Sequence, residues 1–255
     1  MSIELIKKIR VETGAGMGDI KDALDKAEGN EEKAIEILRK SGQQMAAKRA
    51  ERSTSEGIIS IKEEAGKIAV VALACETDFV ARNDDFKKAS ADFADKLFEL
   101  GKDKFNEWAD QEIKNNLIVK IGENINVSSF DIIEGEVMAS YLHSNKKVAS
   151  VVVLEGGDIA KAKEVAMQVV AMNPKYIKPE DVPQEETDKE KEIYKEQLKK
   201  ENKPDEIIEK ILEGKVNKYY SEVCLIKQPY IKEDKMSIEK YLDGATVKHF
   251  SHFSL

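Results

Sequence analysis

The sequence is poor in the residues that support covalent or metal chemistry. It contains two cysteines, three histidines and one tryptophan in 255 residues. Cys75 and Cys224 are too few and too far apart for a disulfide framework, and no Cys or carboxylate stands at a metal-ligand spacing from a histidine. No apolar run approaches the ~20 residues that a membrane-spanning helix needs. These absences exclude a disulfide-stabilised domain, a zinc module and a membrane protein.

Basic residues are outnumbered by acidic ones. Charged residues make up 35% of the chain and the net charge is −8. A general nucleic-acid binder needs a basic surface, so no direct nucleic-acid partner is expected. The one basic cluster, residues 48–52, fits an exposed linker better than a nucleic-acid contact. The chain starts with an amphipathic helix rather than a signal sequence or presequence, so we expect a bacterial cytoplasmic protein, with a mature organellar form left open.

Residues 1–42 are expected to form three short helices. Apolar residues recur at helical spacing in three segments, separated by breaks that contain glycine. Asn30 is a suitable N-cap for the third helix, which we expect to end near Ser41-Gly42. Each helix is too short to be stable alone, so the three must pack as a bundle. Met17, at the start of the second helix, is then an exposed apolar residue suited to a protein contact, and residues 43–55 are a linker.

The glycine-rich segment 14–18 superficially resembles a phosphate-binding loop. A P-loop follows a strand and ends in Gly-Lys-Ser/Thr, whereas here a helix precedes the glycines and Asp19 follows them. Glycines that end one helix and begin the next explain the segment better. No Gly-x-Ser-x-Gly elbow or other nucleophile-base signature occurs in the chain. The sequence therefore favours a protein that acts by binding, with no enzyme activity, no metal and no cofactor expected.

The middle of the chain changes from helical to strand periodicity, which predicts an α+β core with antiparallel sheets. Each of two strand pairs is followed by an amphipathic helix. The pair Glu56-Gly57 reappears as Glu134-Gly135, 78 residues later, which fits either an internal duplication or a chance similarity of two hairpins. The predicted strands are 58–61 with 67–75, turning at 63–66, and 137–143 with 148–154, turning at 144–146. The predicted core subdomains are residues 56–135 and residues 136–183 with 223–255.

Residues 184–222 are expected to form an inserted antiparallel helical hairpin. Residues 184–201 are almost wholly polar and charged, and a proline-containing turn at 202–205 is followed by a regular apolar stripe. The composition also fits a disordered segment, but the regular stripe favours the hairpin.

Four blocks of sequence, in order, resemble the elongation factor Ts family. Any one block is weak, but the ordered set is specific, and the resemblance extends from about residue 3 to about residue 247. The blocks are Thr13-Gly14-Ala15-Gly16-Met17-Gly18-Asp19-Ile20-Lys21-Asp22-Ala23-Leu24 with Gly29-Asn30, Cys75-Glu76-Thr77-Asp78-Phe79-Val80-Ala81-Arg82, Lys120-Ile121-Gly122-Glu123-Asn124-Ile125, and Ser140-Tyr141-Leu142-His143.

The resemblance implies a guanine nucleotide exchange factor of translation elongation. Such a protein binds elongation factor Tu·GDP, disturbs its phosphate and Mg²⁺ site, and promotes GDP release so that GTP can bind. It also implies a ubiquitin-associated type of N-terminal domain that grips the GTP-binding domain of Tu, a two-part core, and a coiled-coil module at 184–222. No membrane partner is expected, and a dimer through the duplicated core or of the whole complex stays open. The alternative is a non-exchange adaptor with a ubiquitin-associated-like domain, which leaves the last three blocks unexplained.

Thr77, Asp78, Phe79 and Val80 are the candidate exchange segment. Read through the resemblance, Phe79 is a wedge between helices of Tu, and Asp78 acts on the loop that it displaces. Read from the residues alone, Thr77 and Asp78 are helix caps and Phe79 with Val80 is a hydrophobic staple. Capping and a wedge can coexist.

Two further residues are candidate contacts with Tu. Ile121 is either a core residue or a partner contact, and His143 is either a polar residue at a strand end or a partner contact. Longer family members continue through a terminal strand and helix that residues 248–255 do not match, so contacts of that extension are not carried over.

Overall fold

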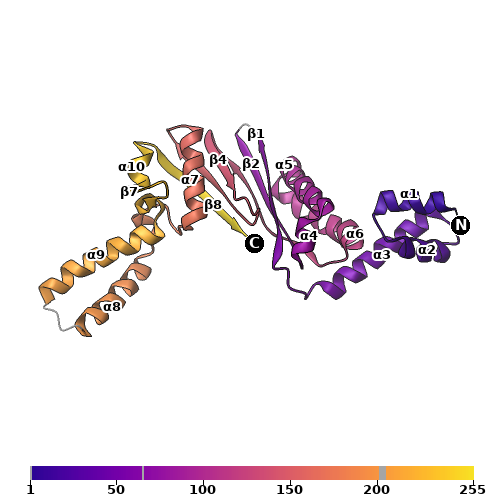
Figure 1. The fold of residues 1–255 in the computed structure, drawn as a ribbon, viewed down its shortest axis with the longest axis horizontal. Coiled ribbons are helices and arrows are strands. Elements are labelled where there is room, and N and C mark those ends of the chain that lie inside the picture. Colours follow the sequence, from indigo (N-terminus) through magenta and orange to yellow (C-terminus); the bar gives the residue numbers. More distant parts are fainter. Residues whose placement is uncertain (1, 65, 201–204) are drawn as a thin grey trace. The chain divides into compact units, whose positions relative to one another are not determined.

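The structure is a computed structural model that describes residues 2–64, 66–200 and 205–255. The chain divides into two compact units, each containing helices and a sheet (Figure 1). The α+β class with antiparallel strand pairs that the sequence predicts is confirmed. The first unit is Met1–Ile133 with Ser144–Val148 and Phe253–Leu255, and the second is Glu134–His143 with Ala149–His252.

The first unit begins with the three predicted helices, α1 (Ile3–Thr13), α2 (Met17–Lys26) and α3 (Glu31–Arg49). Gly14 ends α1 in the left-handed conformation, with φ of 68°, which a glycine adopts without a Cβ penalty. Asn30 caps α3 by accepting a hydrogen bond from the Lys33 amide at 3.0 Å. The helices bury a shared apolar cluster that includes Ile9, Ile20, Leu24, Ala34 and Leu38.

Helix α3 is longer than expected. We predicted its end near Ser41-Gly42, but it continues to Arg49. Gly42 is buried, and a Cβ added there would lie 2.3 Å from Cγ2 of Val119 and 2.9 Å from the carbonyl oxygen of Lys114. The absent side chain therefore allows close helix packing, which explains a glycine in the interior of a helix rather than after its end.

The sheet of the first unit has the strand order β1-β2-β3. Strands β1 (Glu56–Glu64) and β2 (Lys67–Cys75) pair antiparallel, from Glu56↔Cys75 to Glu64↔Lys67. Ala65, in the predicted turn, lies outside the described residues. Strand β3 (Ile125–Glu134) was not predicted, because most of its residues are only half-buried and it lacks the continuous apolar run that marks β2.

Helix α5 (Asp84–Glu112) packs on β1 and β2 and contributes more buried residues to the apolar core around this sheet than any other element. The amphipathic helix predicted after the first strand pair lies here, and its apolar stripe of Phe86, Ala89, Phe93, Ala94 and Leu97 is buried. The chain then continues through a π-helical turn (Ile113–Leu117) into the short helix α6 (Ile118–Ile121).

Aromatic side chains form the centre of this core. The ring centroid of Phe93 lies 4.8 Å from that of Trp108 and 6.1 Å from that of Phe105. The ring centroids of Phe105 and of Phe130, on β3, are 4.9 Å apart. Such tilted and edge-on contacts add to the burial energy of the rings. Strand β3 is thus held to the unit by packing as well as by its ladder.

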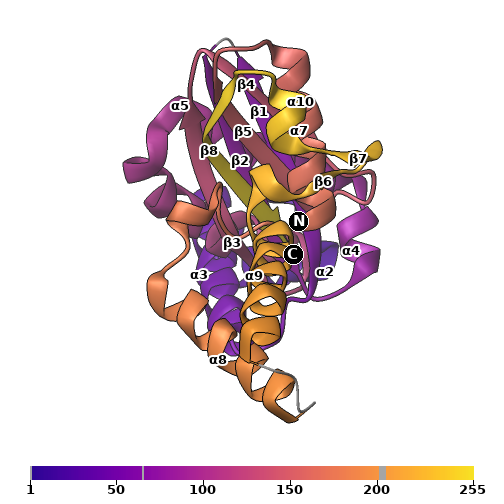
Figure 2. The same cartoon turned by 90° about the vertical axis from the view of Figure 1, so that its left-hand side faces the viewer.

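The second unit is built from the second predicted strand pair and its helix. Strands β4 (Val137–Leu142) and β5 (Val148–Glu155) pair antiparallel, and helix α7 (Ile159–Met172) packs on β4 (Figures 1 and 2). The sheet order is β4-β5-β8, where β8 (Thr246–Ser254) was not predicted. The second unit also contains β6 (Pro229–Tyr230), β7 (Glu233–Ser237) and α10 (Ile238–Leu242).

The second unit contains two helices in the range for which a helical hairpin is predicted. Helices α8 (Gln184–Lys200) and α9 (Asp205–Val223) lie side by side (Figure 2). Residues 202–204 of the predicted turn lie outside the described part of the chain. At the base of the hairpin, the Glu186 carboxylate accepts hydrogen bonds from the hydroxyls of Tyr176 at 2.7 Å and Tyr219 at 2.5 Å. This carboxylate ties the start of α8 to the end of α9.

The aromatic centre gives a direct test of the fold. Phe93→Ala is expected to destabilise the first unit by about 3–5 kcal/mol, since a fully buried ring is removed from a packed core. Denaturant unfolding followed by the fluorescence of Trp108, the single tryptophan, measures this loss. Val11→Ala is the control, because this side chain is 89% exposed and should change stability by less than about 0.5 kcal/mol. Equal effects of the two substitutions would contradict the packing described.

Candidate partner-binding site

The predicted exchange segment lies where strand β2 turns into the short helix α4 (Asp78–Arg82). Thr77 is the N-cap, with an extended backbone, and its Oγ1 accepts a hydrogen bond from the Val80 amide at 3.4 Å. The capping role predicted for Thr77 is confirmed. Asp78 occupies the first turn, where a negative charge interacts favourably with the helix dipole, and its carboxylate pairs with Arg82 at 3.1 Å.

Phe79 projects from this junction into solvent. Its side chain is 83% exposed, whereas Ala81 is buried and Val80 packs against the core of the first unit. The expected hydrophobic staple involving Phe79 is therefore wrong. Consecutive residues of a helix point in directions about 100° apart, so a helix that turns Val80 and Ala81 inward presents Phe79 outward.

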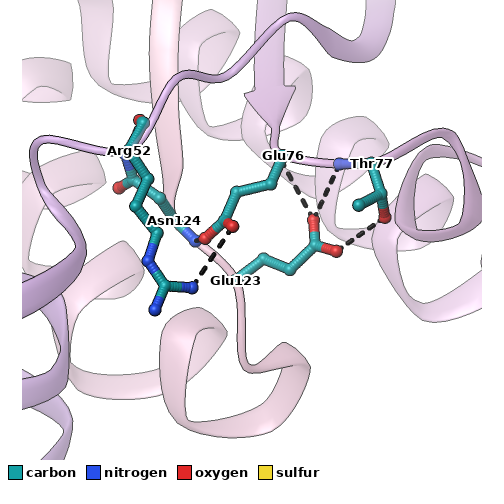
Figure 3. Close-up of polar contacts among 5 residues, drawn as sticks. All are labelled: Arg52, Glu76, Thr77, Glu123 and Asn124. Atoms are coloured by element: carbon teal, nitrogen blue, oxygen red, sulfur yellow. Dashed lines mark hydrogen bonds and ion pairs between the residues drawn. The ribbon is translucent and has the colours of Figure 1, made fainter.

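A reciprocal pair of carboxylates holds the backbone on the strand side of this segment (Figure 3). Glu123 Oε2 accepts hydrogen bonds from the amides of Glu76 and Thr77, both at 3.0 Å, and Glu123 Oε1 accepts one from the Thr77 hydroxyl at 2.6 Å. In return, Glu76 Oε1 accepts a hydrogen bond from the Asn124 amide at 2.6 Å. We call Glu76, Thr77, Glu123 and Asn124 the carboxylate clasp. Hydrogen bonds to an ionised acceptor are the stronger kind.

The carboxylate clasp extends to the chain that follows α3. The Arg52 guanidinium lies 3.3 Å from Glu76 Oε2, and the Asn124 side-chain amide donates to the Arg52 carbonyl at 2.8 Å. The Asn124 amide, with a further contribution from Arg52, holds the pKa of Glu76 below its ordinary value. The charged form of Glu76 is therefore the one that the fold stabilises.

Cys75, the last residue of β2, is an inert part of the junction. It is fully buried, and its thiol donates a hydrogen bond to the Thr77 carbonyl at 3.3 Å. Burial, assisted by the charge of Glu123, raises its pKa to about 12, so the nucleophilic thiolate is scarcely populated at neutral pH.

The other predicted contact residues are distributed over both units. Met17 begins α2 and is 56% exposed, as expected. Ile121 ends α6 and packs partly against the core of the first unit, two residues before Glu123. His143 is exposed, follows β4 in the second unit, and has a ring nitrogen 3.3 Å from the Tyr141 hydroxyl. Ile121 is connected to the exchange segment through Glu123, which hydrogen-bonds to Thr77.

An open cleft lies beside α4 in the first unit. It is lined by Asp78, Ala81 and Arg82 from the helix and by residues 144–147, which directly follow His143. Lys147 pairs with Glu56 at 2.6 Å across the same cleft. The cleft beside α4 thus carries charged side chains of both signs.

These features define a class of protein that acts through surface contact. The candidate site is an exposed aromatic side chain on a short helix whose start is held by Glu123. The described residues include no group of three or more His, Cys, Asp or Glu side chains placed to hold a metal ion. Separately, none of the helices in the described ranges is both long and apolar enough to cross a membrane.

Similar proteins identify the family to which the chain belongs within this class. The sequence model of the family described as elongation factor TS matches residues 76–255. A protein named elongation factor Ts from Hydrogenobaculum is 41% identical, over 100% of this chain and 98% of its own length. One from Deinococcus radiodurans is 40% identical, over 99% of this chain and 99% of its own length. One from Idiomarina loihiensis is 40% identical over 98% of this chain and 89% of its own. The chain belongs to the elongation factor Ts family. This membership supports the exchange-factor function that the sequence blocks imply and does not favour the adaptor alternative.

Sequence reasoning missed the residues that hold the exchange segment in place. Glu123 lies 46 residues from Thr77 in the chain, and a separation of that size gives no pattern that would pair them. The one available signal was that Glu76 and Glu123 lie inside two of the four family blocks. Arg52 was assigned to a linker on the basis of composition.

The lowered pKa of Glu76 predicts how stability depends on pH. Because this pKa is lower in the folded state than its ordinary value of 4.5, the stabilisation is present above about pH 4.5 and is lost as the pH falls through the folded value. Urea unfolding from pH 7 to pH 3 should therefore show wild type more stable than Glu76→Gln at pH 7, with the difference shrinking below about pH 4.5. A difference that did not vary with pH would contradict the assignment.

Proposed function

We propose that this chain binds elongation factor Tu·GDP and releases GDP by inserting Phe79 into Tu, so that GTP can bind. The observation that carries the proposal is the 83% exposure of Phe79 on a helix that is braced against a buried strand. An exposed phenylalanine gains free energy when a partner covers it. An exchange factor must bind the nucleotide-free partner more tightly than the loaded one, since only differential affinity shifts an equilibrium.

The magnitudes set a limit on what Phe79 contributes. Weakening nucleotide binding ~10⁴-fold requires about 5.5 kcal/mol of differential binding. Burying one phenylalanine supplies about 1.5–3 kcal/mol. Phe79 thus accounts for up to about half of such an effect, and other contacts with Tu must supply the remainder.

Asp78 is the next contributor in the proposal. Its carboxylate is paired with Arg82, and 44% of its side chain is exposed, so an exposed ion pair of this kind holds it weakly. On contact with Tu it can exchange Arg82 for donors of the loop that Phe79 displaces, and in this way disturb the Mg²⁺ site indirectly. Thr77 and Val80 act from within, as the cap and the core anchor of α4.

Met17, Ile121 and His143 are proposed as further contacts with Tu. Met17 and His143 are exposed, and Ile121 keeps part of its surface free at the end of α6. The three come from different segments of the chain, which agrees with a broad interface rather than a single pocket. Because translation elongation takes place in the cytoplasm, we propose that the protein acts there.

The finer architecture is part of the proposal. We infer that α1 to α3 form a ubiquitin-associated-like domain and that the two strand-pair-and-helix sets, β1-β2-α5 and β4-β5-α7, are a duplication. In both sets a glycine at or just before the first strand lies close to the second strand. A Cβ added to Gly57 would lie 2.3 Å from the Leu73 carbonyl oxygen, and one added to Gly135 would lie 2.7 Å from a Val153 methyl group. Helices α8 and α9 are then the coiled-coil module of the family.

The direct test of the wedge is Phe79→Ala. The substitution should lower the GDP release rate by about tenfold to a hundredfold, which corresponds to the loss of about 1.5–3 kcal/mol of burial. Stopped-flow fluorescence of labelled GDP leaving Tu, with this protein in excess, measures the rate. The variant should fold normally, since an exposed side chain is removed.

Ile159→Ala is the matched control for this experiment. Ile159 is 62% exposed at the start of α7 in the second unit, so its removal tests whether any exposed apolar group is needed. A Phe79→Ala protein that binds Tu and releases GDP at the wild-type rate would refute the wedge. A wild-type protein that gives no acceleration at micromolar concentration would refute the exchange function itself.

A further inference from the structure

We propose that Glu123 is a positioning residue for the exchange segment: it holds the start of α4 in place so that Phe79 can transmit force to the partner. The proposal rests on the wedge function of Phe79. It assigns to Glu123 an effect on GDP release that is exerted through Thr77, without contact between Glu123 and the partner.

Helix α4 cannot hold Phe79 in place by itself. It has five residues, and isolated helices of that length are unstable in water. Only one face is anchored, through buried Ala81 and partly buried Val80. Phe79 adds no packing of its own, because it is exposed. The direction of its side chain therefore depends on how the backbone just before α4 is fixed.

Glu123 supplies that fixation at the point where strand pairing stops. The ladder between β1 and β2 ends at the pair Glu56↔Cys75. The next two amides, of Glu76 and Thr77, donate instead to Glu123 Oε2. A backbone amide in a partly buried position needs an acceptor, and here one carboxylate oxygen serves both. The other oxygen accepts a hydrogen bond from the Thr77 hydroxyl group, which caps α4.

The fixation works in both directions. Glu76 accepts a hydrogen bond from the Asn124 amide at 2.6 Å. The segment with Glu123 and Asn124 therefore holds the segment with Glu76 and Thr77, and is held by it in return. Figure 3 shows the two side chains crossing between the two backbone segments. A mutually bonded pair resists displacement better than one side chain reaching to a free loop, since moving either segment breaks bonds of both.

Rigidity at this position decides how much of the binding energy of Phe79 reaches the partner. A wedge that separates packed helices experiences an equal opposing force at its base. If the base yields, Phe79 retreats and the partner stays closed, although the surfaces still touch. Binding groups act on a strained state only when their own geometry is held by supporting interactions. Loss of Glu123 should therefore slow GDP release more than it weakens association.

The test is a double-substitution cycle with the full chain and Tu loaded with labelled GDP. Glu123→Ala should lower the limiting GDP release rate by about tenfold, and Glu123→Gln by about threefold, because a neutral amide oxygen still accepts the two backbone amides but forms weaker bonds. The concentration that gives half the limiting rate should change by less than about twofold. In a Phe79→Ala background, Glu123→Ala should have no further effect.

The outcomes separate the two proposals. If Phe79→Ala slows release and Glu123→Ala does not, the positioning role is refuted and the wedge stands. If Glu123→Ala slows release equally with and without Phe79, Glu123 acts by another route and the positioning role is also refuted. If Phe79→Ala is without effect, the wedge fails and the role of Glu123 fails with it.

Two further measurements exclude general unfolding as the cause. Amide hydrogen exchange should accelerate at residues 76, 77 and 80 in Glu123→Ala, with residues 70–73 of the buried strand unchanged. Glu112→Ala is the matched control, since Glu112 is also a half-buried glutamate of this unit and accepts a hydrogen bond from Asn116 at 2.6 Å. It should leave GDP release unchanged. If exchange also rises throughout β2 in Glu123→Gln, the role is general stability, and the proposal is overturned.

Discussion

The burial of strand β2 is the constraint on which the first unit depends. From Ile68 to Cys75 every residue is buried, so this stretch cannot shift without moving the sheet and the helix that packs on it. The chain leaves the strand at Cys75 and must satisfy its next amides within two residues, before α4 begins. The carboxylate of Glu123 meets that need. A fixed strand end and a fixed helix start together make a stiff support at the protein surface.

The phenylalanines of the first unit differ in burial, and this support allows one of them to be exposed. Phe86, Phe93 and Phe105 are buried, and their burial stabilises the fold. Phe79 is exposed and forgoes that gain, since it is turned outward by a short helix whose inner face is anchored. The free energy that an exposed ring forgoes on folding becomes available when a partner covers it. In the proposed function, stability and partner binding thus use the same type of side chain, and the direction of the helix face decides between them.

The distribution of candidate contacts agrees with a protein that acts by binding. Met17, Phe79, Ile121 and His143 come from separate elements, and His143 belongs to a different unit from the others. A catalytic site concentrates its groups around one reacting bond, whereas an exchange factor has to grip a partner over a wide surface and deform it at one position. In the second unit, hydrogen bonds from Tyr176 and Tyr219 to Glu186 join the start of α8 to the end of α9.

Local rules in the sequence determined the α+β class, the three N-terminal helices, both strand pairs, the helical hairpin and the capping role of Thr77, because periodicity and caps involve residues close together in the chain. Family resemblance selected residues 77–80 as the site. Only the tertiary structure decided three other features: that Gly42 lies within a helix, that residues 125–134 and 246–254 are strands, and that Glu123 braces Thr77. The physical reason is the same in each case. A close helix contact, a half-polar strand and a carboxylate 46 residues from its donors are all defined by neighbours in space, and those neighbours leave no periodic trace along the chain.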